Sequence, residues 1–374
     1  MLLEKIDALL VTDPDNIRYL SGFYGLAPQE REAYALVTAD MTFLFVNALY
    51  SEHAKQLSKS PTLKLTHDPG RAINIIEISH DKPMSQKLKE IIKSLALPHT
   101  AKLGFEETNL TVAELSKLRS QLQEIQLIST RDRVEALRKL KHPKEIEFIR
   151  SAANLTDQCF VFILDKLKNG VTESEIAWEI ETFFHSHGAE PAFSPIVAFN
   201  QNSSQPHYRP SHNSPASPAG GQLATHNQLI LLDIGARVNG YCADMTRMVI
   251  VVALESEINN AYTALKSAQQ KALDLFVSGE RSGARLDAYV REELTKAGFP
   301  TYPHSLGHSV GLAIHEGPRL SVRRDEELKP GMVITVEPGI YLEGKFGMRI
   351  EDLVLIQEKG IEVLSTSPKN LIQL

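Results

Sequence analysis

The chain has 374 residues, of which 43% are hydrophobic and 23% are charged, and its formal net charge at pH 7 is -6. This length and apolar content suffice for two or three domains with substantial cores, and the modest acidity gives no reason to expect nucleic acid or an anionic membrane as a partner. We expect a cytoplasmic protein, because residues 1–7 lack a secretory signal pattern, no apolar run approaches a membrane span, and two cysteines are too few for a disulfide framework.

Residues 1–130 predict an alternating α/β domain. The spacing of apolar positions predicts three strands and three helices there, at 7–12, 34–39 and 41–48 and at 51–58, 84–95 and 111–123. A basic stretch follows and ends at Pro143, which suits the first position of a helix over 144–167. We therefore assign residues 131–374 to a second domain.

The second domain repeats one order of elements. Two helices, over 144–167 and 173–187, precede a first hairpin, and two more, over 256–278 and 284–297, precede a second hairpin. Sequence identity between the two halves is not evident. The order of elements nevertheless predicts a site at the interface of two similar halves, where both hairpins converge.

The first hairpin is indicated by Asn239-Gly240 between two apolar runs, which is typical of a two-residue type I′ turn. With these residues at the tip, the register places Asp233 opposite Thr246. Asp244 then has the same facing as Asp233 and is its diagonal neighbour, with Cβ atoms roughly 7 to 8 Å apart. One hairpin therefore brings two carboxylates within reach of one ion.

The second hairpin is expected from strands over 333–341 and 348–356, joined by a glycine-containing turn. These strands carry Glu337 and Glu351. An ionised carboxylate in an apolar strand is costly to bury unless a cation or strong donors compensate it. One such acid alone is best explained as a cap or a salt bridge, but four acids in two matching hairpins favour a metal site.

Three histidines, His304, His308 and His315, stand close together among glycines that allow near approach of the backbone. Four carboxylates carry four negative charges, so two divalent ions balance them where one ion leaves a net charge of minus two. Oxygen-rich ligands with one imidazole suit Mn²⁺ best, with Co²⁺ or Zn²⁺ as alternatives. Two ions about 3.5 to 4 Å apart acidify a bridging water and polarise a carbonyl, so metal-assisted hydrolysis is the leading reaction class.

These residues resemble the pita-bread metallopeptidases of family M24, and within them the proline-specific branch of aminopeptidase P and prolidase. The matching motifs occur in the family's order, at 232–236, 240–247, 307–312 with His315-Glu316, 336–341 and 348–352. The resemblance implies an α/β (α+β) fold with a creatinase-like N-terminal domain that partly covers the site and a pita-bread catalytic domain with pseudo-twofold internal duplication. A homodimer is the expected assembly.

The resemblance also implies roles for individual residues. Five would be the ligands of a dinuclear metal centre, namely Asp233, Asp244, His308, Glu337 and Glu351, with Asp244 and Glu351 as the bridges. Glu337 would also relay a proton. Three histidines would bind the substrate and steady the tetrahedral intermediate, namely His207, His304 and His315, while Tyr341 and Arg349 would line the proline end of the pocket.

Two features depart from the family pattern. Phe199-Asn200 stands where a small residue and a glycine are usual, which bears on the fit of the substrate's first side chain. The stretch 211–222 is rich in Ser, Pro and Gly and longer than the usual connection, and we interpret it either as a surface insertion or as a flap near the mouth of the site.

We interpret the chain as an Xaa-Pro aminopeptidase acting on peptides with proline at the second position. The alternative is an Xaa-Pro dipeptidase, in which Arg349 grips a free proline carboxylate. The aminopeptidase is preferred because no second cationic residue is evident beside the ligand motifs, and rejection of longer peptides is expected to need more than one contact. A non-catalytic binding protein and an enzyme for a small non-peptide such as creatine are disfavoured because the ligand set is complete.

Overall fold

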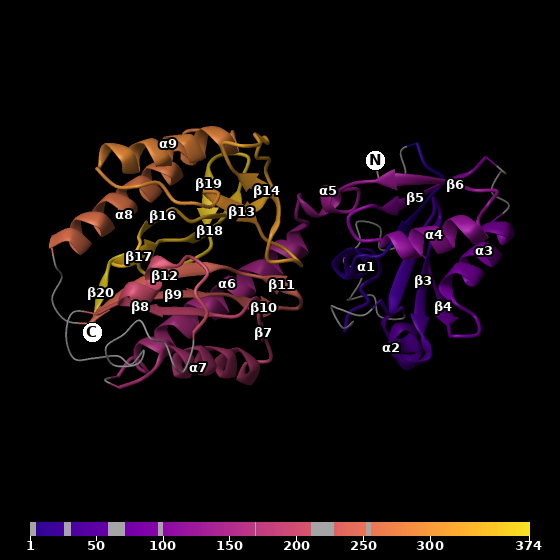
Figure 1. Ribbon diagram of the computed structural model, residues 1–374, viewed down its shortest axis with the longest axis horizontal. Helices are drawn as coiled ribbons and strands as arrows, with labels where there is room; N and C mark the ends of the chain where they lie inside the picture. Colours follow the sequence, from indigo (N-terminus) through magenta and orange to yellow (C-terminus); the bar gives the residue numbers. More distant parts are fainter. Residues whose placement is uncertain are drawn as a thin grey trace. The chain divides into compact units, whose positions relative to one another are not determined.

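The computed structural model describes residues 5–25, 31–58, 72–95, 100–168, 170–210, 228–251 and 256–374 (Figure 1). The chain divides into two compact units, Met1–Arg138 and Lys139–Leu374, and both mix helices with strands as expected. Residues 131–138, which the sequence pattern assigned to the second domain, belong to the first unit, where Arg138 Nη1 donates a hydrogen bond of 2.7 Å to Asn16 Oδ1. The stretch 211–222 lies outside the described residues.

The N-terminal unit is built on one mixed sheet of six strands in the order β4-β3-β2-β1-β5-β6. Its strands are β1 (Ala8–Val11), β2 (Ala33–Val37), β3 (Met41–Asn47), β4 (Ala72–Ile78), β5 (Lys102–Glu106) and β6 (Gln126–Thr130). Its helices are α1 (Pro14–Ser21), α2 (Ala48–Ser58), α3 (Met84–Ser94), α4 (Val112–Gln121) and α5 (Glu135–Arg138). The three expected strands and three expected helices are among them.

Helix α1 was not expected, although its start follows ordinary rules. Asp13 caps it by accepting a hydrogen bond of 2.9 Å from Asn16 N, and Pro14 occupies a first-turn position that needs no N–H donor. At 8 residues the helix is too short to show a repeating apolar pattern.

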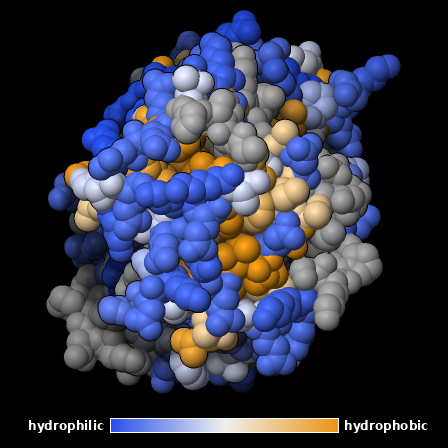
Figure 2. All heavy atoms as spheres, turned by 90° about the vertical axis from the view of Figure 1, so that its right-hand side faces the viewer, coloured by the Kyte–Doolittle hydropathy of each residue, from blue (hydrophilic) through white to orange (hydrophobic). Residues whose placement is uncertain are grey.

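Figure 2 shows the side of the N-terminal unit that lies at the right in Figure 1. Hydrophobic residues are exposed there among hydrophilic ones. Leu49 and Val112 are the most exposed large hydrophobic residues described, and a cavity of about 320 Å³ is lined by residues that include Met84 and Leu118. Among the described residues, the group of acids and histidine able to hold a metal lies in the other unit. Within the part described, no such group therefore lies in the N-terminal unit.

The C-terminal unit places two pairs of helices on opposite sides of its strands (Figure 1). The helices are α6 (Pro143–Leu164) and α7 (Glu173–Ser186) on one side and α8 (Ser256–Val277) and α9 (Gly283–Lys296) on the other. All four agree with the expected positions, and each pair precedes a hairpin. None of the helices described is long and apolar enough to cross a membrane.

The strands of this unit form two larger sheets and two small ones, in the orders β20-β12-β9-β8, β14-β13-β15-β18-β19, β11-β10-β7 and β16-β17. The first half supplies β7 (Glu190–Pro191), β8 (Ile196–Phe199), the 3₁₀ helix η1 (Asn200–Ser204), β9 (Gln228–Ile234), β10 (Ala236–Val238), β11 (Tyr241–Cys242) and β12 (Met245–Val251). The second half supplies β13 (Gly307–Ser309), β14 (Glu316–Leu320), β15 (Val333–Val336), β16 (Gly339–Leu342), β17 (Phe346–Arg349), β18 (Asp352–Ile356), β19 (Ile361–Val363) and β20 (Ile372–Gln373).

The register of the first hairpin is as predicted. Thr246 pairs with Asp233, and the tip residues Asn239 and Gly240 have φ of 51° and 87°, as a type I′ turn requires. The ladder is interrupted around Gly235, where a Cβ would lie 2.1 Å from the carbonyl oxygen of Ala243. A glycine is therefore required at the point where the chain leaves β9.

The second hairpin differs from the prediction in one respect, since each of its expected long strands is broken in two. The breaks fall at the acids. Glu337 N donates to Leu306 O at 2.8 Å, and Glu351 N donates to Thr246 O at 3.2 Å, so both leave the hairpin's own ladder. Pro338 follows Glu337 and has no N–H to donate. The pairs on either side, Val336 with Asp352 and Gly339 with Arg349, keep Glu337 and Glu351 opposite each other.

Candidate metal centre

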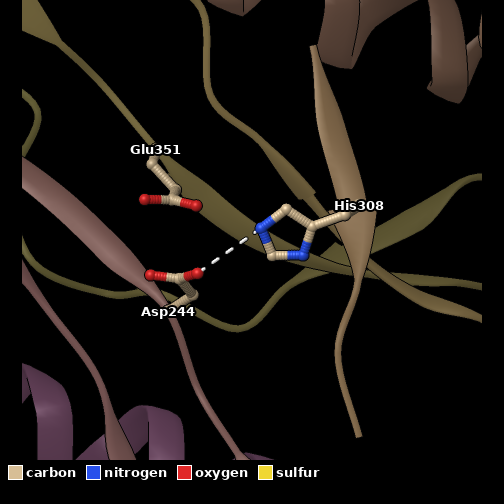
Figure 3. Close-up of side chains that lie close together, drawn as sticks. All are labelled: Asp244, His308 and Glu351. Atoms are coloured by element: carbon tan, nitrogen blue, oxygen red, sulfur yellow. Dashed lines mark ion pairs between the residues drawn. The ribbon is translucent and has the colours of Figure 1, made fainter. Parts of the chain in front are cut away.

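Three potential ligands converge at the ends of strands from both halves (Figure 3). Asp244 precedes β12, His308 lies on β13, and Glu351 lies between β17 and β18. Each offers one ligand atom, and these atoms lie within 4.8 Å of one another. All three side chains are buried, and they point toward a common centre.

Glu337 and Asp233 complete the predicted set of five. Glu337 Oε1 lies 3.3 Å from His308 Nε2, and Asp244 Oδ2 lies 3.6 Å from the same nitrogen. Asp233 Oδ2 accepts a hydrogen bond of 2.5 Å from Arg349 Nη2. The two hairpins and β13 therefore bring four of the candidate ligands together, and Asp233 is close enough for its charge to act on Asp244, Glu337 and Glu351.

The electrostatics of this group favour a cation at its centre. Burial, and after it the charge of Glu351, raises the pKa of Asp244 well above its usual range. Burial, and after it the charge of Glu337, does the same to the pKa of Glu351. Burial raises the pKa of Glu337 to about 7. Several ionised carboxylates in one dry site repel each other, and divalent ions remove that repulsion.

The hydrogen-bonding state of the acids also fits bound metal. Among the residues that the structure describes, Asp233 Oδ1 and Glu351 Oε1 are buried oxygens without a hydrogen-bond partner. A buried acceptor left without a partner costs about 1–3 kcal/mol, and more when it is charged. Coordination by a divalent cation would satisfy both oxygens, and carboxylates with one imidazole suit such ions.

His308 is prepared as a neutral ligand. Burial, and after it the nearby His315, lowers the pKa of His308 to about 3, so its imidazole is neutral near pH 7. Its Nδ1 lies 3.2 Å from the carbonyl oxygen of Ser309, which can only accept, so Nδ1 carries the proton. The lone pair of Nε2 is therefore free to face the acids and a metal.

Two threonines donate hydrogen bonds to the carboxylates of Glu351 and Glu337. Thr246 Oγ1 donates to Glu351 Oε2 at 2.7 Å and accepts from Arg349 Nε at 2.9 Å. Thr335 Oγ1 donates to Glu337 Oε1 at 3.2 Å. Because each threonine lies on a strand paired with another ligand-bearing segment, the carboxylates are fixed in orientation as well as in position.

His304 lies beside this centre, joined to it by Tyr341. Its Nδ1 donates to Ser305 O at 2.8 Å, and its Nε2 accepts from the Tyr341 hydroxyl at 3.1 Å. Burial, and after it the charge of Arg349, lowers the pKa of His304 to about 4. A neutral His304 is thus oriented toward Glu337, whose Oε2 lies 4.0 Å from Nδ1.

His315 and His207 are the more exposed histidines of the predicted set. The rings of His315 and His308 meet edge to face, with centroids 4.5 Å apart. Burial first, then the charges of Arg319 and His207, lower the pKa of His315. The charge of His207 also acts on His304. His304 and His315 therefore lie next to candidate ligands, and the charge of His207 reaches both of these histidines.

Tyr341 and Arg349 are joined by a hydrogen bond of 2.8 Å from Arg349 Nη1 to the Tyr341 hydroxyl. Burial raises the pKa of Tyr341 to about 12, so the phenol remains protonated. Arg349 is buried and also binds Asp233, Thr246 and, at 3.4 Å, the carbonyl oxygen of Pro206. Most donors of the Arg349 guanidinium are therefore used in hydrogen bonds within the protein. Few remain to bind the substrate carboxylate, which is the role that the dipeptidase alternative expected of this residue.

Two residues near the site were missed by the sequence reasoning, namely Arg319 and Lys141. Arg319 on β14 pairs with His308 on β13, and its charge contributes to the lowered pKa of His308 and of His315. The ladder shifts register between His308 and Ser309, so counting along the strands could not have placed Arg319. Lys141 is distant in sequence, and its buried contact with Ser309 left no local signal.

Comparison with known proteins gives two family matches and close structural neighbours. Residues 1–140 match the Creatinase/Prolidase N-terminal domain, and residues 147–358 match Metallopeptidase family M24. The chain is 33% identical over 371 residues to a protein named Xaa-Pro dipeptidase from Pyrococcus furiosus, with 98% of this chain and 96% of the relative covered.

Two solved structures are similar over nearly the whole chain. Xaa-Pro dipeptidase from Bacillus anthracis has a TM-score of 0.85 at 32% identity, with 99% of this chain and 96% of that chain covered. An X-Pro aminopeptidase from Thermotoga maritima MSB8 has a TM-score of 0.83 at 29% identity, with coverage of 99% and 98%. Both units of this chain therefore have counterparts in single known proteins.

Proposed function

We propose that this chain, which belongs to metallopeptidase family M24, is an Xaa-Pro dipeptidase that hydrolyses the bond before a C-terminal proline. Relatives named Xaa-Pro dipeptidase cover nearly the whole chain at 32% to 33% identity. These similarities support the dipeptidase alternative better than the aminopeptidase that the sequence alone favoured. The five candidate ligands and the three histidines, in the roles expected from the sequence, are the residues to which we assign the reaction.

One observation carries the choice between the two activities, and it is the position of Arg319. The aminopeptidase was preferred because no second cationic residue was evident beside the ligand motifs. Arg319 is such a residue, since it is exposed and its charge reaches His308, His315 and Glu337. A guanidinium that is exposed at the site is available to a free carboxylate, as Arg349 is not.

Different residues of the chain would serve different steps of the hydrolysis. The chemistry that divalent cations supply in such a site is acidification of water and polarisation of the scissile carbonyl. Glu337, whose Oε1 accepts from Thr335 Oγ1 and whose Oε2 lies 4.0 Å from His304 Nδ1, would pass a proton to the departing proline nitrogen. His304, fixed by Ser305 and Tyr341, would orient the substrate, and His315 and His207 would bind it as well.

Comparison of kcat/KM for Ala-Pro and Ala-Pro-Ala on the Mn²⁺-loaded protein tests the proposal. We expect a preference for the dipeptide of about tenfold or more, which corresponds to about 1.4 kcal/mol in transition-state binding. Equal or faster hydrolysis of the tripeptide would restore the aminopeptidase. Absence of hydrolysis of any Xaa-Pro peptide would reject both activities.

Arg319→Met tests the observation on which the proposal rests. A charge-assisted hydrogen bond is worth about 1.5–3 kcal/mol, so kcat/KM for Ala-Pro should fall about tenfold to a hundredfold. Ala-Pro amide, which has no carboxylate, should be hydrolysed by the variant and the wild type alike. Arg323→Met is the control, because Arg323 is an exposed arginine just beyond β14. A loss of equal size on both substrates would assign Arg319 another role.

Three finer expectations from the sequence remain proposals. We propose Mn²⁺ as the resident metal, with Co²⁺ or Zn²⁺ as alternatives, because the candidate ligands are carboxylates with one imidazole. We also propose a homodimer and a cytoplasmic location. Metal analysis of the purified protein, light scattering during gel filtration and cell fractionation test these statements in turn, and a different metal, a monomer or a secreted protein would contradict them.

A further inference from the structure

Lys141 has a buried side chain next to the metal centre, although no role was expected for it. Its ammonium is fully excluded from solvent and lies 3.2 Å from Glu316 Oε2, whose side chain is 7% exposed. Lys141 Nζ also donates to Ser309 Oγ at 2.9 Å. A buried charge needs a partner, so neither side chain can lose the other without a large cost.

Glu316 uses its second oxygen to shape the turn before it. Glu316 Oε1 accepts from Ala313 N at 3.2 Å. A Cβ on Gly311 would lie only 2.5 Å from the same oxygen, so the chain is packed closely around the carboxylate. The turn over 311–316 therefore takes its form from a carboxylate that Lys141 holds in place.

This turn presents a histidine to the site. His315 directly precedes Glu316, and its ring meets the ring of His308 at 4.5 Å. Ser309, the other contact of Lys141, directly follows His308 and donates to Val333 O at 2.8 Å. One ammonium group thus ties β13, which carries a candidate ligand, to the turn that carries a candidate substrate residue.

We propose that Lys141 is a positioning residue for His315 and acts on it through Glu316. The inference rests on the proposed function only in giving His315 a role in hydrolysis. The effect of the lysine is to fix the distance between His315 and the candidate ligand His308. This also gives Glu316, which belongs to the matched sequence pattern, a physical purpose.

Lys139 provides a matched control two residues away. Its ammonium pairs with Glu326, and its side chain passes over Gly317. Both members of that pair are partly exposed, at 21% and 27%, and neither contacts the turn over 311–316 in any interaction described. Lys139→Met therefore removes a neighbouring lysine while leaving the support of His315 unchanged.

Hydrogen exchange tests the positioning directly, without reference to activity. We expect Lys141→Met to speed exchange in peptides covering 309–316 by about tenfold or more, because the hydrogen bond to Ala313 N loses its anchor. Lys139→Met should exchange as the wild type does. The double variant Lys141→Met with Glu316→Gln removes both charges of the ion pair together, and it should also exchange faster. Unchanged exchange in the charge-free double variant would overturn the inference.

Kinetics with Ala-Pro then tests whether the position of His315 is what Lys141 controls. Lys141→Met should lower kcat/KM about a hundredfold, as misplacement of a catalytic group by about 1 Å can do, with metal per chain unchanged. In a His315→Ala background the same substitution should cost less than about twofold, since its target is gone. A full additional loss would show that Lys141 acts elsewhere. If the wild type hydrolyses no Xaa-Pro peptide, the proposed function fails, and the exchange comparison alone decides the positioning.

Discussion

Asp244 and Glu351 are the acids whose removal should have the largest effect on the centre. Both are buried, and the pKa of each is raised first by burial and then by the charge of another acid in the site. We expect Asp244→Ala or Glu351→Ala to abolish loading of two metal ions and turnover with it, because two cations would face each other with less negative charge between them. Metal analysis and an Ala-Pro assay measure both effects.

The exposed acid Asp274, at the end of α8, serves as the control, and Asp274→Ala should retain metal and activity. If either Asp244→Ala or Glu351→Ala kept two bound ions and normal turnover, the assignment of both as bridging ligands would have to be abandoned.

The histidines around the centre should behave differently from the ligands. His207→Ala, His304→Ala and His315→Ala are expected to keep stoichiometric metal while kcat/KM falls about a hundredfold to ten-thousandfold, the usual range for acid, base and positioning groups. His80→Ala is the control, because His80 is fully exposed in the N-terminal unit. Loss of metal from any of the three would show that the ligand set includes that histidine.

Individual residues differ in how far the sequence could predict them. The acids could be found because a carboxylate inside an apolar strand is costly wherever the strand lies. Arg319 and Lys141 could not, since nothing in their local sequence departs from that of ordinary surface residues. The contact of Lys141 with Ser309 spans 168 residues of chain and exists only in the folded unit.

The two hairpins show the same difference between local and distant causes. The register that pairs Asp233 with Thr246 follows from Asn239-Gly240, because a two-residue turn fixes every later pair. The breaks at Glu337 and Glu351 have a distant cause, since their N–H groups bond to segments outside the hairpin. Turn chemistry is readable from the sequence, and partners brought by tertiary structure are not.

Gly235→Ala tests how closely the first hairpin is packed where it approaches the centre. The added Cβ would meet the Ala243 carbonyl oxygen at 2.1 Å and the Phe193 ring at 2.8 Å. Overpacking of this kind costs about 1–3 kcal/mol, and here it also pushes Asp244 away from the other ligands. We expect a lower Tm and reduced metal loading together, measured by calorimetry and metal analysis.

Gly344→Ala, in the tip of the second hairpin, separates backbone strain from steric clash. Gly344 has φ of 73° and no atom within 4 Å of an added Cβ, so its substitution costs only the left-handed backbone, roughly 1 kcal/mol. It should lower Tm slightly and leave metal loading unchanged.

The prediction for Gly235→Ala fails if that variant binds metal normally. Normal loading would mean that the interruption of the ladder at Gly235 is unimportant for the centre.

One hydrophobic core joins the two halves of the C-terminal unit. It contains Leu229 and Met248 from the first hairpin, Leu265 from α8, and Ile334 and Val354 from the second hairpin. The N-terminal unit has a separate core of its own. Because candidate ligands from both halves are carried by strands of one shared core, binding of metal there would be coupled to the stability of the whole C-terminal unit.

This coupling makes the stabilisation by metal dependent on pH, with a sign that the acids determine. Burial raises the pKa of Glu337 from 4.5 to about 7 in the metal-free protein. Between these values the folded state holds a proton that the unfolded chain has released, so the free energy of unfolding of the metal-free protein falls as pH rises through this window. A cation needs the ionised carboxylate of Glu337, so below about pH 7 it must displace the proton that this carboxyl holds. His308 has its pKa lowered to about 3 by burial, so it is already neutral and has no proton for the cation to displace.

The rise in Tm on adding Mn²⁺ should therefore be larger at about pH 7.5 than at about pH 5.5. Each proton displaced costs about 1.4 kcal/mol of binding free energy for every pH unit below the pKa of the group. Scanning calorimetry with and without excess Mn²⁺ at the two pH values measures the difference, and Mg²⁺ at the same concentration controls for a general effect of divalent salt. The metal-free protein should lose stability over the same interval in which the gain from Mn²⁺ grows. An equal gain at both pH values would mean that no buried acid gives up a proton when metal binds, and the account of the raised pKa of Glu337 would then be wrong.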